Sequence, residues 1–155
     1  MKPTLKTHGL ELAVAAFCAW QAAELLNAWR HSPFDRLGWL SFLIWLIPVA
    51  ICFIRHNSPA TDSVFFIILA LIMAVIGRLL EVNALMGIAL AFSLAGFVRS
   101  SMQRMFWLAG AISWMPALGW LAHNLPVYMV VATRLLLVVA TTLPLLLAPR
   151  KIQPS

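Results

Sequence analysis

One apolar stretch of the sequence carries a permanent charge at its middle. It reads PVYMVVATRLLLVVATTLPLLLA, from Pro126 to Ala148, and the charge is Arg134. An unpaired arginine at the centre of a membrane helix costs about 2.5–3.5 kcal/mol on insertion scales. Arg134 lies eight residues after Pro126, and Glu24 lies six residues before Arg30. With Pro126 and Arg30 at the outer surface of the hydrocarbon core, a rise of 1.5 Å per residue puts the two charged residues roughly 12 and 9 Å below that surface. We predict that Arg134 faces the bundle interior and pairs with Glu24; the alternative is an arginine that snorkels to the headgroups.

Polar residues also recur along the first apolar stretch. Gln21, Glu24, Asn27 and His31 are spaced by three and four residues, so they share one face of a helix. Ionisable residues at membrane depth mark functional sites by default, and we predict a polar pocket that opens toward the outside. The alternative is a set of interfacial polar residues without a ligand. The predicted pocket residues are Glu24, His31, Arg78, Glu81, His123 and Arg134.

The sequence offers no pattern typical of an active site or a metal centre. It contains no H-E-x-x-H, C-x-x-C, Walker or G-x-S-x-G motif and only five acidic residues. Cys18 and Cys52 lie within apolar stretches, where the setting leaves a thiol inert. Cys52 precedes Arg55 and His56, but these residues lie near the predicted cytoplasmic end of the second span, so we assign them no catalytic role. We therefore predict no catalytic, cofactor-binding or metal-binding residue, which favours a protein that is not an enzyme.

The elements that must position these residues are apolar runs. Of 155 residues, 63% are hydrophobic and 10% charged, against about 25% charged in an ordinary soluble domain. Since a span takes about 20 apolar residues, we expect a single transmembrane domain, residues 1–155. Its fold class is an all-α polytopic bundle of about six helices. The spans are predicted at 10–29, 39–54, 64–80, 84–98, 105–122 and 126–148, and the short fourth span can form a tight hairpin with the third through GRLLEVN.

The distribution of positive charge predicts the orientation of the bundle. The net charge of +6 is carried by Lys and Arg that stand singly or in pairs between apolar runs, which argues against nucleic acid as a partner. With both termini in the cytoplasm, seven of these residues fall inside and three outside, as the positive-inside rule favours. The expected location is the inner (plasma) membrane, with the lipid bilayer, other membrane subunits or a second copy as partners. The inside set is Lys2, Lys6, Arg55, Arg99, Arg104, Arg150 and Lys151; the outside set is Arg30, Arg36 and Arg78.

Small residues recur at every fourth position of the predicted fourth span. Gly87, Ala91 and Ala95 form this series, and such a series allows a neighbouring helix to approach closely. We predict packing within the bundle, with self-association as the alternative.

Three stretches resemble a known family of membrane proteins. They are RHSPFDRLGWLSFLIWLIPVA, GRLLEVNALMGIALAFSLAGF and WLAGAISWMPALGWLAHNLPVYMVVATRLL, within residues 28–145. In texture and order they are similar to the N-terminal half of the exosortases and archaeosortases, multi-pass enzymes that process C-terminal sorting signals of exported proteins. The family carries a catalytic Cys, typically followed by Ser-Gly, with an Arg and a His downstream. This chain has no Cys-Ser-Gly, so the resemblance implies a non-catalytic relative, and no catalytic residue is transferred.

A weak internal repeat supports a second hypothesis. WLSFLIWLIP and WLAGAISWMP share Trp-Leu and a second Trp followed closely by Pro. Three spans per half would make the halves inverted, as in many transporters of small solutes. We rank this hypothesis below a non-catalytic accessory membrane subunit. A third hypothesis is a sorting-type peptidase whose missing nucleophile is supplied by a partner chain.

Overall fold

The computed structural model describes residues 9–55, 63–98, 100–116 and 124–147, and this part of the chain is all-α, as the composition predicts. Three short 3-10 turns join or extend the α-helices: η1 (Ala22–Glu24), η2 (Pro33–Asp35) and η3 (Ala111–Ser113). The α-helices are α1 (Gly9–Gln21), α2 (Leu25–His31), α3 (Gly38–Arg55), α4 (Ser63–Leu79), α5 (Asn83–Ala95), α6 (Ser101–Gly110) and α8 (Val127–Leu147).

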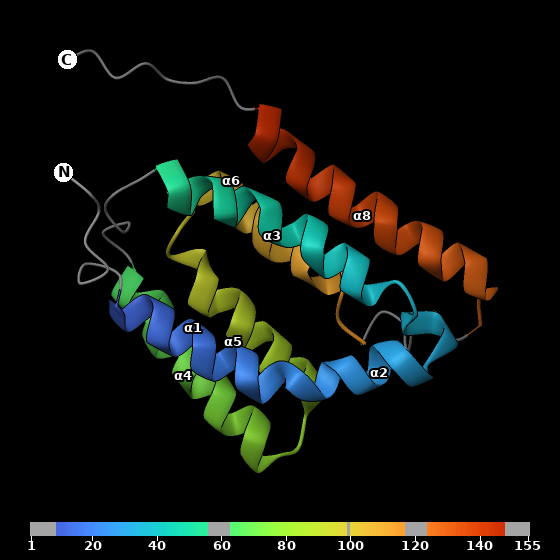
Figure 1. The fold of residues 1–155 in the computed structure, drawn as a ribbon, viewed down its shortest axis with the longest axis horizontal. Coiled ribbons are helices and arrows are strands. Elements are labelled where there is room, and N and C mark those ends of the chain that lie inside the picture. The colour runs from blue at the N-terminus through green and yellow to red at the C-terminus, as the bar shows by residue number, and fades with distance from the viewer. Residues whose placement is uncertain (1–8, 56–62, 99, 117–123, 148–155) are drawn as a thin grey trace.

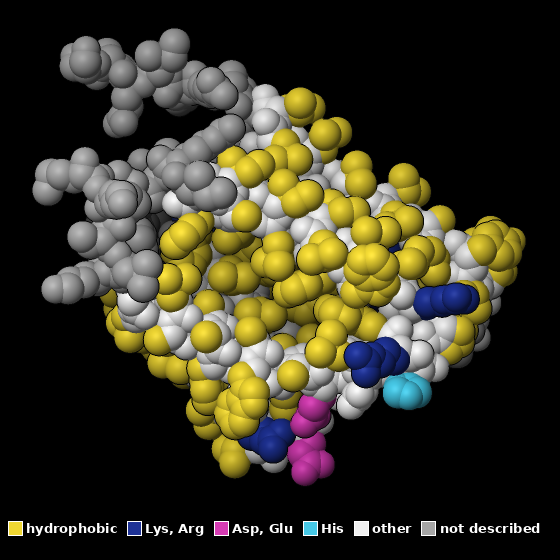
Figure 2. All heavy atoms as spheres, viewed as in Figure 1, with side chains coloured by type: hydrophobic (Ala, Val, Ile, Leu, Met, Phe, Trp, Pro, Cys, Tyr) yellow, Lys and Arg dark blue, Asp and Glu magenta, His cyan; other side chains and the backbone are white. Residues whose placement is uncertain are grey.

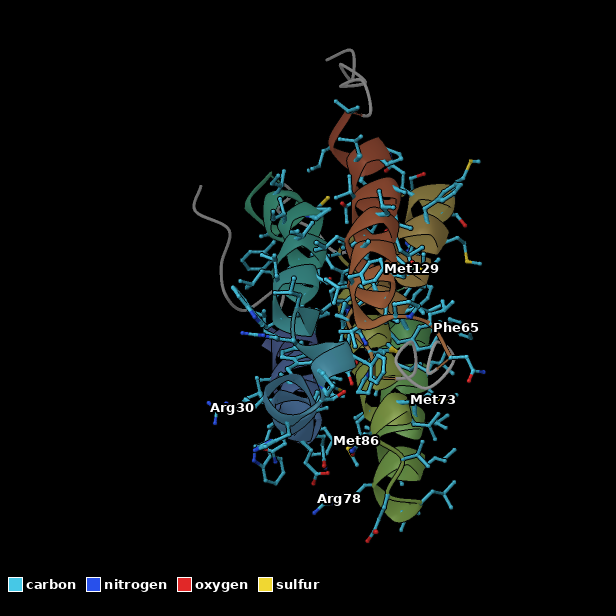
Figure 3. All side chains as sticks on the ribbon, turned by 90° about the vertical axis from the view of Figure 1, so that its right-hand side faces the viewer. Arg30, Phe65, Met73, Arg78, Met86 and Met129 are labelled. Carbon is cyan, nitrogen blue, oxygen red and sulfur yellow. The ribbon has the colours of Figure 1, made fainter. Side chains whose placement is uncertain are left out.

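The helices are arranged in two layers (Figures 1 and 3). One layer holds α4, α5 and the rod formed by α1, η1 and α2; the other holds α3, α6 and α8. The beginning of α1 and the end of α8 lie toward the same side of the bundle (Figure 1), and the turn between α2 and α3 lies at the opposite side together with the beginning of α8. We call that opposite side the α2 end.

Three helical stretches are long and apolar enough to cross a membrane: Gly9–His31, Pro33–Phe53 and Val127–Leu147. Two further apolar helices are shorter, and α5, with 13 residues, covers about 20 Å of the roughly 30 Å hydrocarbon core. Apolar side chains cover most of the described surface in Figure 2. The three long helices and this surface fit a membrane protein.

The predicted fifth span differs most from the observed helices. We expected it at 105–122, whereas α6 begins at Ser101, between the fourth and fifth predicted spans, and its α-helical part ends at Gly110. Ser100, in an extended conformation (φ −76°, ψ 126°), precedes the helix, and its carbonyl accepts the N–H of Arg104 at 2.8 Å. After Gly110 the chain tightens into η3, and residues 117–122 lie outside the described part.

Two buried indoles join α3 to α6 by reciprocal hydrogen bonds. The Trp45 Nε1–H donates to the Trp107 carbonyl at 2.8 Å, and the Trp107 Nε1–H donates to the Trp45 carbonyl at 2.9 Å. The rings stack with centroids 4.0 Å apart, and neither side chain is exposed. The Ala111 N–H bonds to the Leu108 carbonyl because η3 tightens the helix, which frees the Trp107 carbonyl for Trp45. The core of this layer therefore contains two stacked indoles whose N–H groups and backbone carbonyls are hydrogen-bonded to each other.

The tight hairpin of α4 and α5 is confirmed, and so is the packing of the small residues on α5. Gly87, Ala91 and Ala95 are all buried. A Cβ at position 87 would lie 3.3 Å from the Trp114 ring. The small side chains of α5 thus allow the hairpin to approach both α1 and the aromatic core of the other layer.

Gly110 lies where α6 packs tightly against α3 and α8. A Cβ there would lie 3.1 Å from Thr141 Cβ on α8 and 3.2 Å from Trp45 Cδ1 on α3. We expect Gly110→Ala to lower the free energy of unfolding by about 1–3 kcal/mol, since extra volume in a packed core forces its neighbours to move. Thermal unfolding in mild detergent would measure it. Gly9→Ala is the control, because a Cβ there meets nothing within 4 Å; equal melting temperatures for the two variants would refute the close packing.

Candidate functional site

Arg134 lies in the bundle interior, but its carboxylate partner is Asp35. The Arg134 side chain is fully buried, and its Nη2 forms an ion pair with Asp35 Oδ1. Nη1 donates to the Ser113 carbonyl at 3.0 Å, and Nη2 also donates to the Met115 carbonyl at 3.2 Å. The predicted pairing of Arg134 with Glu24 is wrong, as is the snorkelling alternative. One guanidinium joins η2, the end of η3 and α8.

Asp35 reaches this position because the turn after α2 folds into the bundle. Ser32 is extended, Pro33 begins η2, and the Asp35 N–H bonds back to the Ser32 carbonyl at 3.1 Å. The turn contacts α8, which leaves Asp35 only 5% exposed. Asp35 lies between the first two predicted spans, 10–29 and 39–54, on the predicted outer side, so its carboxylate was not considered at the depth of Arg134. The Ser-Pro start of the turn, typical of a helical turn, was the available signal.

The broken end of α6 provides the remaining acceptors. Carbonyls at the end of a helix have no partner within the helix and carry its partial negative charge. Here Arg134 binds the carbonyls of Ser113 and Met115, and the Trp29 Nε1–H donates to the Trp114 carbonyl at 3.0 Å. Side chains from α8 and α2 therefore satisfy three successive carbonyls in an apolar setting. Of the Arg134 nitrogens, Nε has no hydrogen-bond partner.

A second ion pair lies at the exposed rim of the other layer. Arg78 Nη1 donates to Glu24 Oε1 at 3.1 Å, and the two side chains are 61% and 52% exposed. Figure 3 shows Arg78 at the end of α4, far from α8. His31 is also exposed, and its Nδ1 lies 2.9 Å from the Asn27 carbonyl of the same helix. Within the described residues, Arg134 therefore forms no ion pair or hydrogen bond with Glu24, Arg78 or His31.

Glu81 occupies the turn between α4 and α5 in a strained conformation. Its side chain is exposed and its φ is 54°, a region that usually requires glycine. The Val82 N–H bonds to the Gly77 carbonyl at 2.9 Å across it, which is the bond of a Schellman cap with Glu81 in the glycine position. His123, the last predicted pocket residue, lies outside the described residues.

The conformation of Glu81 gives a direct prediction. Glu81→Gly should raise the free energy of unfolding by about 1 kcal/mol, because the left-handed conformation costs a non-glycine residue about 1–2 kcal/mol. Part of this gain is offset by the greater freedom of glycine in the unfolded chain. Unfolding in mild detergent measures the change. Glu81→Ala is the matched control; if the alanine variant is stabilised as much as the glycine variant, the backbone is not the cause.

The structure also buries an arginine that we had assigned only to the cytoplasmic loops. Arg104 on α6 is buried, its Nε–H donates to the Val98 carbonyl at 2.9 Å, and its guanidinium carbon lies 4.6 Å from the centre of the Phe66 ring. Arg104 therefore packs within the bundle, whereas the sequence placed it only in the predicted inside set of charges. Cys18 is a free thiol and is fully buried.

The described residues hold no group of three or more His, Cys, Asp or Glu side chains arranged to bind a metal ion. Comparison of the chain with protein-family models, with curated proteins and with solved structures gave no match. The described residues thus form an all-α membrane protein in which Arg134 and Asp35 make a buried ion pair.

Proposed function

We propose that the chain is a multi-pass protein of the inner membrane, with both termini in the cytoplasm, that serves as a non-catalytic, exosortase-like accessory subunit. In this proposal the Arg134–Asp35 junction fixes the outer end of the bundle. The exposed rim that includes Glu24, His31, Arg78 and Glu81 contacts the partner subunit. The exosortase relationship rests on the sequence resemblance alone.

The main support for this proposal is that the carbonyls after the end of α6 are bound by side chains of the same chain. In transporters, the ends of interrupted helices coordinate the substrate or the coupling ion. Here the carbonyls of Ser113 and Met115 accept hydrogen bonds from Arg134 of the same chain. A helix end that is already bound by its own bundle supports a scaffolding role over transport.

The packing of the helices also fails to follow the repeat that the transporter hypothesis requires. If the two halves were inverted copies, α4 on α5 would correspond to α8 on α1. Instead α8 packs against α3 and α6. The similarity between WLSFLIWLIP and WLAGAISWMP is therefore not accompanied by the helix contacts that an inverted repeat requires.

Photo-crosslinking in native membranes tests the accessory role. A photoreactive amino acid at Leu80, on the exposed rim, should form an adduct with a larger membrane protein, whereas one at Leu136, exposed on α8, should label lipid; both side chains are exposed to similar extents, 64% and 70%. A membrane protein that contains Cys-Ser-Gly as the adduct would support the exosortase-like assignment. Adducts with lipid alone at both positions, together with solute uptake by proteoliposomes of the purified chain, would contradict the proposal.

The proposed orientation makes a separate prediction. With Cys18 and Cys52 replaced by alanine, a cysteine at Asn124 should react with a membrane-impermeant maleimide in intact cells, because the α2 end faces outward. A cysteine at Ser101 should react only after the membrane is opened. Both positions are exposed, so access to the reagent is matched. The reverse pattern would place the termini outside.

A further inference from the structure

A partly open apolar groove of about 200 Å³ lies between the rod formed by α1, η1 and α2 and the N-terminal part of α3. Figure 2 shows apolar side chains on both sides of the hollow between these elements. One wall consists of Ala19, Ala22 and Ala23, whose small side chains leave the space. Leu90 of α5 is among the residues that line it. The groove thus has an alanine wall on the rod and contacts from both layers.

Aromatic residues fix the shape of the groove toward the α2 end. Trp29, Phe42 and Trp114 line it there, with the Phe42 ring centre 5.7 Å from that of Trp29 and 5.1 Å from that of Trp114. The Trp29 indole is held by its hydrogen bond to the Trp114 carbonyl. Because these rings are held by one another and by the broken end of α6, the groove is preformed.

The alanine wall continues directly into a positive charge. Ala19, Ala23, Leu26 and Arg30 follow one another at steps of four, three and four residues, so they lie on one face of the rod. Figure 3 shows Arg30 projecting from α2 on the side that Figure 2 views. Arg30 is exposed and forms no ion pair within the described part of the chain. The groove is therefore apolar along its length and cationic at its α2 end.

The dimensions match one leaflet of a bilayer. From Ala19 to Arg30 the rod rises about 16 Å at 1.5 Å per residue, and half of the hydrocarbon core is about 15 Å. An acyl chain is thin enough for the groove, and a phosphate at the headgroup level would complement Arg30.

We propose that this groove is a binding site for an anionic phospholipid, with one acyl chain along the alanine wall and the phosphate on Arg30. The leaflet-length apolar wall fits the acyl chain of any phospholipid, and the positive charge of Arg30 favours a lipid with net negative charge over a neutral one. The proposal does not depend on the accessory role, because neither residue of the Glu24–Arg78 pair lines the groove.

The test uses the full chain, purified in mild detergent and reconstituted in nanodiscs of phosphatidylglycerol and phosphatidylcholine in equal amounts. Native mass spectrometry counts the lipid retained on release, and a phosphatidylglycerol with a diazirine on its acyl chain maps the contact. The unaltered chain should retain phosphatidylglycerol preferentially, and the label should map to the segment that contains Ala19 and Ala23. Arg30→Gln should lower the ratio of phosphatidylglycerol to phosphatidylcholine about fivefold, because the two lipids share the phosphate but differ in net charge, and one arginine favours the anionic lipid by about that factor. Its labelling of the groove should persist.

Filling the groove provides the second variant. Ala23→Leu should abolish the groove label, whereas Ala13→Leu, at an exposed alanine of α1 that does not line the groove, should leave it unchanged. The melting temperatures of all variants without added lipid show whether each remains folded. Unchanged retention and labelling in both Ala23→Leu and Arg30→Gln would overturn the proposal. So would labels confined to other exposed helix faces, or a protein helix crosslinked in the groove in place of the lipid.

Discussion

Replacing Asp35 with asparagine is expected to lower the free energy of unfolding by about 3–5 kcal/mol, because it leaves a buried guanidinium without its counter-ion. Arg134 is fully buried and bound to Asp35 and two carbonyls, so the charge cannot reach water without local unfolding. Arg134→Gln should have a similar effect, since it leaves a buried carboxylate and two unsatisfied carbonyls. Unfolding of the purified chain in mixed micelles measures both changes.

Glu24→Gln is the matched control for Asp35→Asn. It makes the same chemical change, carboxylate to amide, in an ion pair whose side chains are about half exposed. Such a pair contributes about 0–1 kcal/mol. If Glu24→Gln destabilises the protein as much as Asp35→Asn, the difference in burial between the two ion pairs does not govern their energetics.

Truncation of either indole of the Trp45–Trp107 pair is expected to have an effect of comparable size. Trp45→Ala or Trp107→Ala should lower the free energy of unfolding by about 3–5 kcal/mol, as is typical of a buried tryptophan. Each change also leaves one buried carbonyl without its indole donor. Because the rings bind one another, the double variant should lose less than the sum of the single changes.

Trp20→Ala serves as the control for this pair. Trp20 is 72% exposed on α1, and exposed positions usually change stability by less than about 0.5 kcal/mol. Additive losses for Trp45→Ala and Trp107→Ala would show that the reciprocal contact contributes no coupling.

The fold class and most helix positions could be predicted because apolar runs and loop residues determine them locally. GRLLEVN predicted the hairpin of α4 and α5 correctly, since its polar residues separate two apolar runs. The early end of α6 could not be predicted from hydropathy, because Ala111 to Trp114 are as apolar as a continuing helix. Its cause is tertiary: Trp29, Trp45 and Arg134 bind the carbonyls that the break releases.

The partner of Arg134 was missed for a similar reason. The depth estimate assumed that loops stay at the membrane boundary, and it therefore counted only carboxylates within apolar runs. Asp35 lies in a loop sequence that folds into the bundle, whereas Glu24, at the expected depth, faces α4 and binds Arg78. Sequence spacing gives the depth of a residue along its helix but not the neighbour that it faces, which depends on how the helices pack.

A double-mutant cycle on Asp35 and Arg134 tests the central claim most directly. The free energy of unfolding is measured for the unaltered chain, for Asp35→Asn, for Arg134→Gln and for the double variant, with a second cycle on Glu24 and Arg134 as reference. The account predicts a coupling energy at the upper end of the usual range, about 2–3 kcal/mol, for Asp35 with Arg134, and none for Glu24 with Arg134. Additive effects in the first cycle, or a coupling confined to the second, would contradict it.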